Sequence, residues 1–135
     1  MSTSTTASVS THILDTSIGR PAAGVAVQLA ARSGRSAHYG QGGDWQALGG
    51  SATDADGRCK DLPALPAGTT HVRLDFVVEP YFEKKQADAQ QDAPANRDSG
   101  AFFPEVAITF AVKPGEHYHV PLLLNPFGYS VYRGS

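Results

Sequence analysis

The sequence has little cysteine, few charged residues and no long hydrophobic run. Its 135 residues contain one cysteine, Cys59, which excludes an internal disulfide framework. Lysine and arginine total 11 against 13 aspartates and glutamates, so the net charge of −2 offers no basic surface for nucleic acid. Polar residues interrupt every apolar run before the roughly 18 residues that a membrane span needs, so we expect no membrane partner.

The two ends of the sequence carry no targeting signal of a common type. Residues 1–8 contain neither a basic cluster nor an apolar stretch, which is not typical of a secretion signal. The last four residues are Tyr-Arg-Gly-Ser, whereas a peroxisomal address resembles Ser-Lys-Leu. We therefore expect a cytoplasmic protein.

The composition is that of one folded domain. Hydrophobic residues make up 41% of the chain and charged residues 18%, which excludes a disordered chain. At this size, folding buries about two-thirds of the surface of the unfolded chain, enough for an ordinary core. We expect a flexible polar arm over residues 1–7 and a single domain over residues 8–135.

Apolar and polar residues alternate with a period of two through most of the chain, as is typical of strands. Val25, Val27 and Leu29, for example, alternate with smaller or polar residues. Glycine, proline and aspartate mark turns between such segments, and the pattern predicts an all-β sandwich. The strand-like segments are 8–14, 25–30, 72–78, 106–112, 117–124 and 128–133, with a shorter pair at 45–48 and 50–53.

Two regions depart from this alternation. Residues 33–43 are rich in glycine and serine and are expected to form a loop. Residues 80–91 contain a run of good helix formers and are the one candidate helix, followed by residues 92–100 with loop composition.

Three histidines lie on predicted strands. Alternation places His117 and His119 on the face opposite Tyr118, and His12 on the face opposite Ile13. If the two strands share a sheet, the three imidazoles converge on one outer surface. Such histidines are often simply solvated. Three imidazoles with an open fourth position would also suit a catalytic zinc ion.

The segment Asp54-Ala55-Asp56-Gly57 resembles the start of a calcium loop. The twelfth position of such a loop needs glutamate and is Leu65 here, so the segment predicts a hairpin turn instead. Arg58 then begins the next strand. The last eight residues remain aromatic and strand-like, although chain ends are usually polar and frayed.

Four groups of residues together resemble the motifs of the 5-hydroxyisourate hydrolases, the transthyretin-related enzymes. The resemblance covers about residues 8–135, and the segments 33–43 and 87–100 look longer than in compact members of the family. The motifs are Ser10–Thr16 with Gly19–Ala22, Asp54–Arg58, Phe102–Glu105 with Glu116–Leu124, and the terminal Tyr132–Ser135.

The resemblance implies a transthyretin-like β-sandwich of two four-stranded sheets with one short helix. It implies a homotetramer, a dimer of dimers, with active sites in the channel between the dimers. The implied reaction is hydrolysis of 5-hydroxyisourate to 2-oxo-4-hydroxy-4-carboxy-5-ureidoimidazoline, a step of urate degradation. It implies no metal and no organic cofactor.

The resemblance also implies a set of site residues. His12, Arg58, His119 and Ser135 match the catalytic positions, whereas His117 does not. Tyr132, with His12 and Arg58, matches positions that bind substrate. A histidine can activate water near neutral pH, and a guanidinium can stabilise the developing oxyanion. Which histidine is base and which is acid stays open.

Three other functions remain open. The first is a transthyretin-type small-molecule carrier, which thyroxine binding without hydrolysis would indicate. The second is a zinc-dependent hydrolase using His12, His117 and His119, which metal analysis and chelators would reveal. The third is a sandwich interaction domain, in which mutation of the outward histidines has no effect.

Overall fold

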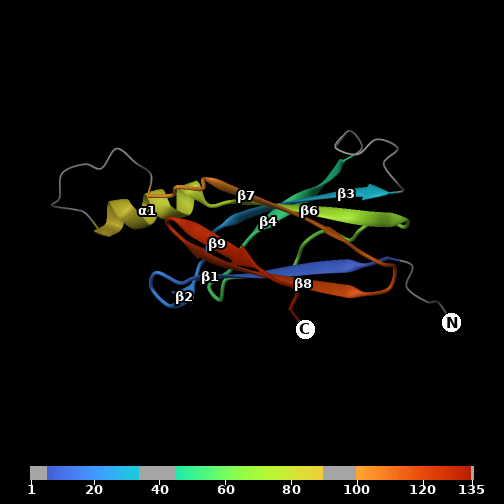
Figure 1. Cartoon of the computed structure of the whole chain (residues 1–135), viewed down its shortest axis with the longest axis horizontal. Helices are drawn as coiled ribbons and strands as arrows, with labels where there is room; N and C mark the ends of the chain where they lie inside the picture. Colours follow the sequence, from blue (N-terminus) through green and yellow to red (C-terminus); the bar gives the residue numbers. More distant parts are fainter. Residues whose placement is uncertain (1–5, 34–44, 90–99, 135) are drawn as a thin grey trace.

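A computed structural model describes residues 6–33, 45–89 and 100–134. This part of the chain forms two β-sheets packed face to face, with one helix at one end of the sandwich (Figure 1). Most of the two expected loops, at 34–43 and 92–99, lies outside the described residues, as do residues 1–5 of the expected arm. Ala7, at the end of that arm, is 4% exposed and belongs to the core.

The first sheet has the order β2-β1-β8-β9, and the short β5 pairs along β1. Strands β1 and β8 run parallel, and every other pairing in this sheet is antiparallel. The predicted four-stranded sheet is confirmed, with β5 as an added two-residue strand. The bounds are β1 Ser8–Asp15, β2 Arg20–Pro21, β5 Arg58–Cys59, β8 His117–Asn125 and β9 Gly128–Val131.

The second sheet is antiparallel throughout and has the order β4-β3-β6-β7, which confirms the other predicted four-stranded sheet. Its bounds are β3 Ala26–Ser33, β4 Gln46–Ala52, β6 Thr69–Val77 and β7 Glu105–Ala111.

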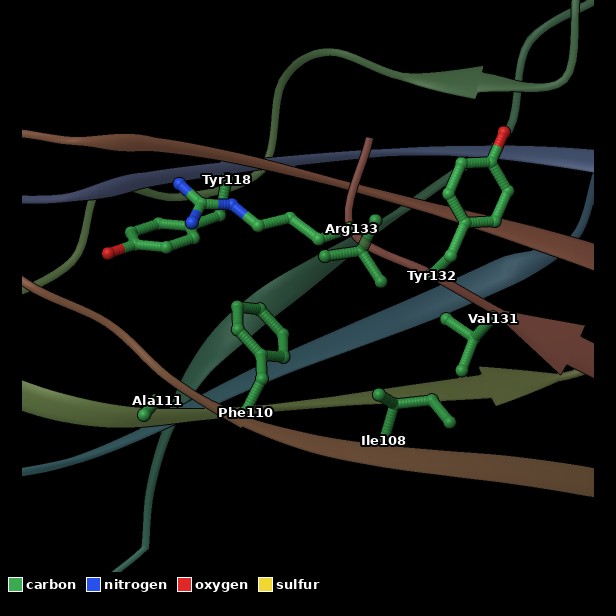
Figure 2. A pocket seen from close by; sticks show the side chains of 8 residues that line it. Ile108, Phe110, Ala111, Tyr118, Val131, Tyr132 and Arg133 are labelled. Carbon is green, nitrogen blue, oxygen red and sulfur yellow. The ribbon is translucent and has the colours of Figure 1, made fainter. Parts of the chain in front are cut away.

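A cavity of about 260 Å³ lies where β7 faces β8, β9 and the C-terminal residues (Figure 2). Figure 2 shows the Arg133 side chain lying over the ring of Tyr118, whereas the Tyr132 ring points away from Phe110. The lining is mainly apolar. Its residues are Ile108, Phe110, Ala111, Tyr118, Val120, Val131, Tyr132 and Arg133.

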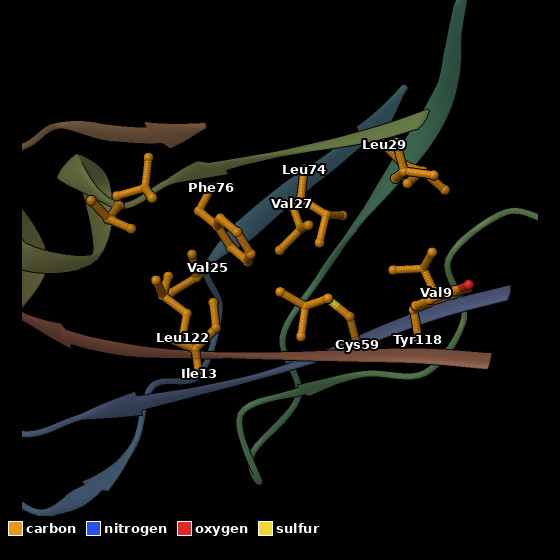
Figure 3. Packing of buried hydrophobic residues seen from close by; sticks show 14 of the residues in the cluster. Val9, Ile13, Val25, Val27, Leu29, Cys59, Leu74, Phe76, Tyr118 and Leu122 are labelled. Atoms are coloured by element: carbon orange, nitrogen blue, oxygen red, sulfur yellow. The ribbon is translucent and has the colours of Figure 1, made fainter. Parts of the chain in front are cut away.

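The core between the sheets is built from alternate residues of the strands (Figure 3). Ile13 and Leu122 from the first sheet and Leu74 and Phe76 from the second are fully buried. Burying one such side chain stabilises the fold by about 1.5–3 kcal/mol. Tyr118, Val120, Leu122 and Leu124 are all buried, as the alternation predicted. The opposite face of β1 and β8 is therefore free to carry polar side chains.

Strand β4 differs from the shorter pair predicted at 45–48 and 50–53, because it runs without a break through two glycines. Gly49 has a φ of 137°, and the register between β3 and β4 shifts beside it. A Cβ on Gly50 would lie 2.6 Å from the Val27 carbonyl oxygen. The glycines therefore permit a bulge and a close approach within one strand, where the sequence analysis placed a break.

Helix α1, Glu79–Ala89, begins one residue before the predicted segment. Its attachment to the first sheet depends on Asp15, whose side chain is fully buried. The Tyr81 hydroxyl and the Lys85 ammonium both donate to Asp15 Oδ2, at 2.7 and 2.8 Å. Burial raises the pKa of Asp15, but hydrogen bonds from Lys85, Ser17 and Tyr81 outweigh burial and hold the pKa below its usual value. No helix in the described ranges is long and apolar enough to span a membrane.

Candidate functional site

The candidate site lies on the outer face of the first sheet. In the parallel pairing of β1 with β8, Ser10 lies opposite His119 and His12 lies opposite Pro121. The two strands thus share a sheet, which is the condition under which the histidines converge. His117 is exposed, and His12 and His119 are half-buried.

Arg58 is brought to the same face by the pairing of β5 with β1, in which it lies directly opposite His12. Residues opposite each other in an antiparallel pair hold their Cβ atoms about 4.5–5.5 Å apart, so the two side chains are neighbours. Arg58 is exposed. Its guanidinium is a forked hydrogen-bond donor that can bind an anionic group.

The turn before Arg58 fixes this pairing. The Asp54 carboxylate accepts hydrogen bonds from the backbone N–H groups of Asp56 and Arg58, at 2.9 and 3.0 Å. The bond from the Arg58 N–H contributes most to lowering the pKa of Asp54. Gly57 has a φ of 76°, and a Cβ there would lie 2.5 Å from the Ile13 carbonyl oxygen. The predicted turn is confirmed, and it packs closely against β1, but it does not close a hairpin, because β4 pairs with β3 in the second sheet and β5 pairs with β1 in the first.

His12 has one ring nitrogen held by this turn. Its Nε2 lies 2.9 Å from the Asp56 carbonyl oxygen. A carbonyl oxygen only accepts, so Nε2 carries the proton and donates it. In the neutral ring, Nδ1 is then the free acceptor.

His119 lies in a more crowded setting. Its Nδ1 is 2.8 Å from the Ser10 hydroxyl oxygen. Burial lowers the pKa of His119, and the nearby positive charges of Arg58, His12 and His117 lower it further. At neutral pH the ring is therefore uncharged, the form that can accept a proton.

The C-terminal residues after β9 run beside His119. The Gly134 N–H donates to the His119 carbonyl oxygen at 2.8 Å, and the Tyr132 N–H donates to that of Pro121 at 3.4 Å. A Cβ on Gly134 would lie 2.8 Å from His119 Cδ2 and 3.3 Å from Pro121 Cγ. Only glycine lets the backbone pass this close to the imidazole.

Arg133 holds this segment in place. Its guanidinium is 3.2 Å from the Glu116 carboxylate and stacks over the Tyr118 ring, 4.5 Å from the ring centre. Tyr132 is 56% exposed. Ser135, the remaining predicted site residue, lies outside the described residues.

The structure thus brings His12, Arg58 and His119 together on one face, beside Gly134. Ser8, Ser10 and Gly134 are not among the site residues expected from the sequence. The two serines share the outward alternation of His12 on β1, and this signal could have identified them. Nothing in the sequence alone indicated the contact of Gly134 with His119.

The three histidines are not arranged as a set of metal ligands. Both ring nitrogens of His117 lie within hydrogen-bond distance of serine hydroxyls, and Nε2 of His12 faces a carbonyl. Among residues 6–33, 45–89 and 100–134, no group of three histidine, cysteine, aspartate or glutamate side chains is placed to hold a metal ion.

Known proteins resemble the chain over nearly its whole length. It is 40% identical to the 5-hydroxyisourate hydrolase of Salmonella dublin over 94% of this chain and 80% of that protein. It is 42% identical to the uric acid degradation bifunctional protein TTL of Arabidopsis thaliana, over 94% of this chain but only 37% of that longer protein. The solved structure of Klebsiella pneumoniae 5-hydroxyisourate hydrolase matches with a TM-score of 0.62 and 33% identity, over 94% of this chain and 98% of that one.

The family resemblance drawn from the motifs is confirmed by these matches and by a sequence model of one family, which matches residues 9–134. The observed sheets and helix have the transthyretin-like arrangement that the resemblance implied. The chain belongs to the HIUase/Transthyretin family.

Proposed function

We propose that this protein hydrolyses 5-hydroxyisourate to 2-oxo-4-hydroxy-4-carboxy-5-ureidoimidazoline. The observation that carries the proposal is the gathering of His12, Arg58 and His119 on one outer face of the first sheet. The 40% identity to the Salmonella dublin hydrolase supports the choice of substrate. The family includes both hydrolases and transthyretins, so these polar residues favour the enzyme over the carrier.

The proposed chemistry divides water activation from charge stabilisation. A neutral imidazole takes a proton as water attacks the ring carbonyl of the substrate. Negative charge then grows on the carbonyl oxygen, and the Arg58 guanidinium stabilises it and holds the anionic ring. The second imidazole donates a proton to the departing nitrogen. Tyr132 and Ser135 complete the polar walls of the site.

We also propose that the active form is a homotetramer, a dimer of dimers. The site lies on an outer sheet face, so a second subunit is needed to enclose it. Phe102 and Phe127 are 70% and 80% exposed, and exposed aromatic side chains favour association. Cytoplasmic action stays a prediction, which cell fractionation with an antibody would test.

A coupled assay tests the reaction. Urate oxidase generates 5-hydroxyisourate, and its decay is followed with and without the purified protein. We expect faster decay and an optically active product, detected by circular dichroism. An unchanged decay rate with folded protein would contradict the proposal. Tight binding of thyroxine in that case would favour the carrier, and activity lost to chelators would favour the zinc hydrolase.

A further inference from the structure

A chain of polar side chains extends from His119 along the outer face of β1 and β8. His119 Nδ1 is 2.8 Å from the Ser10 hydroxyl oxygen, which is 2.9 Å from His117 Nε2. His117 Nδ1 is in turn 2.6 Å from the Ser8 hydroxyl oxygen. The order is therefore His119, Ser10, His117, Ser8, and the last two side chains are exposed.

The Ser10 hydroxyl couples the two imidazoles. It has a single proton to donate, yet it lies within hydrogen-bond distance of two ring nitrogens. It must therefore donate to one ring and accept from the other. If His119 carries its proton on Nδ1, Ser10 donates to His117 Nε2, and neutral His117 donates from Nδ1 to Ser8. In the opposite arrangement, Ser10 donates to His119 Nδ1, and the proton of the neutral His119 ring lies on Nε2.

Only one of these two tautomers of His119 leaves a free ring nitrogen that can reach a water molecule beside the substrate. Nδ1 of His119 is occupied by Ser10, so only Nε2 is available to meet a water molecule. To accept a proton on Nε2, the neutral ring must carry its own proton on Nδ1. His12 differs, because the Asp56 carbonyl holds its proton on Nε2 permanently.

We propose that Ser10 and His117 are positioning residues that hold the proton of resting His119 on Nδ1 and leave Nε2 bare to act as the base. This role rests on the proposed hydrolysis. The hydrogen-bonded chain also gives the positive charge that His119 gains a path to the exposed His117. When Nε2 takes the proton of water, the Nδ1 proton moves to Ser10 while that of Ser10 moves to His117. The neutral His119 then holds its proton on Nε2, and the exposed His117 carries the charge.

The first experiment needs no substrate. Nitrogen-15 NMR of histidine-labelled protein identifies which ring nitrogen carries the proton. We expect His119 to be protonated on Nδ1 in the wild type and in Ser10→Thr, which keeps the hydroxyl. Ser10→Ala and His117→Phe should move the proton to Nε2. A wild-type ring protonated on Nε2, or a Ser10→Ala ring unchanged from wild type, would overturn the proposal.

The second experiment measures turnover in the coupled assay. Ser10→Ala is expected to lower kcat about 10-fold with KM unchanged, a part of the ~10²–10⁴-fold that acid–base catalysis supplies. Ser10→Thr should restore kcat. Ser51→Ala is the matched control. Ser51 lies on β4 of the second sheet, where its hydroxyl donates to Asp61, so its loss should leave kcat unchanged. Equal kcat in Ser10→Ala and wild type would contradict the role.

The two experiments separate this inference from the proposed function. A folded wild type that fails to hydrolyse 5-hydroxyisourate but shows the expected proton positions would refute the function and leave the hydrogen-bonded chain established. An active enzyme whose His119 is unaffected by Ser10→Ala and by His117→Phe would refute the positioning role alone. Thermal melts of each variant check that the sandwich is intact.

Discussion

At the scale of single residues, the candidate site depends on backbone groups as much as on side chains. The Asp56 carbonyl sets the proton of His12, and the Gly134 N–H binds the carbonyl of His119 itself. Preorganised groups of this kind keep a catalytic imidazole in a single orientation. Substitutions can therefore impair the site by removing an ionisable group or by displacing one.

The ionisable groups give the largest expected effects. Replacing His12, Arg58 or His119 singly with a non-ionisable residue should lower kcat/KM at least ~10²-fold, because we propose that each supplies acid–base catalysis or oxyanion stabilisation. His117→Asn should cost much less. Steady-state kinetics in the coupled assay measure both. Equal losses for His117→Asn and His119→Asn would mean that His117 itself contacts the substrate.

A substitution at Gly134 tests the effect of displacing the His119 ring. An added Cβ would lie 2.8 Å from His119 Cδ2, so Gly134→Ala should push the ring aside and lower kcat about 10²-fold, as small misplacements do. The melting temperature should barely change. Gly128→Ala is the control, since its Cβ would meet only Asn125 atoms at 3.9 and 4.0 Å. Equal activity of the two variants would argue against close positioning of His119.

The pH dependence follows from the lowered pKa of His119. Its ordinary value is 6.5, and burial with three nearby positive groups moves it down. The neutral, proton-accepting form therefore persists as the pH falls past 6.5. We expect the acid limb of kcat/KM below that pH. The profile reports apparent values for the coupled His12 and His119 together, and an acid limb above 6.5 would contradict the expectation.

At the scale of elements, helix α1 depends on one carboxylate. Tyr81 and Lys85 lie one turn apart on the helix, and both donate to the fully buried Asp15 at the end of β1. The cluster joins the helix to the strand that carries His12. The helix segment could be predicted from its helix formers, but this attachment could not, because Asp15 precedes Lys85 by 70 positions.

The attachment should make stability sensitive to acid. The pKa of Asp15 is lowered in the folded state, so its contribution is complete above the unfolded value of ~3.9 and is lost as the pH falls through the folded value. Asp15→Asn should remove about 3 kcal/mol of unfolding free energy at pH 7. Denaturant unfolding at pH 7 and pH 3 measures this. Asp75→Asn, in the half-buried pair with Arg73, keeps access to solvent and should cost about 1 kcal/mol or less.

At the scale of the whole molecule, the expected assembly encloses the site. Size-exclusion chromatography with light scattering should report about four chains, because the outer face that carries His12 and His119 is open in a single chain. Dilution should reduce specific activity as the assembly dissociates. A stable monomer with full activity would contradict the tetramer.

The sequence predicted the sandwich and the outward face of the histidines, because strand alternation is local and depends on neighbouring residues. The contacts of Ser10 with two imidazoles could not be predicted, because they require the parallel register of β1 with β8. Gly49 and Gly50 misled for a related reason. In a sequence, a glycine pair predicts a turn, and only the structure shows that Gly50 lies too close to the Val27 carbonyl oxygen on β3 to carry a side chain.

The parallel pairing of β1 with β8 has a consequence for how activity first appears during folding. The two strands that carry the histidines are 109 positions apart, so the site requires closure of almost the entire chain. Closing so long a loop costs entropy before any contact repays it, and folds with such distant contacts form slowly. Recovery of catalysis after dilution from denaturant should therefore lag behind recovery of β-structure, and enzymatic turnover becomes a reporter of the final step of folding.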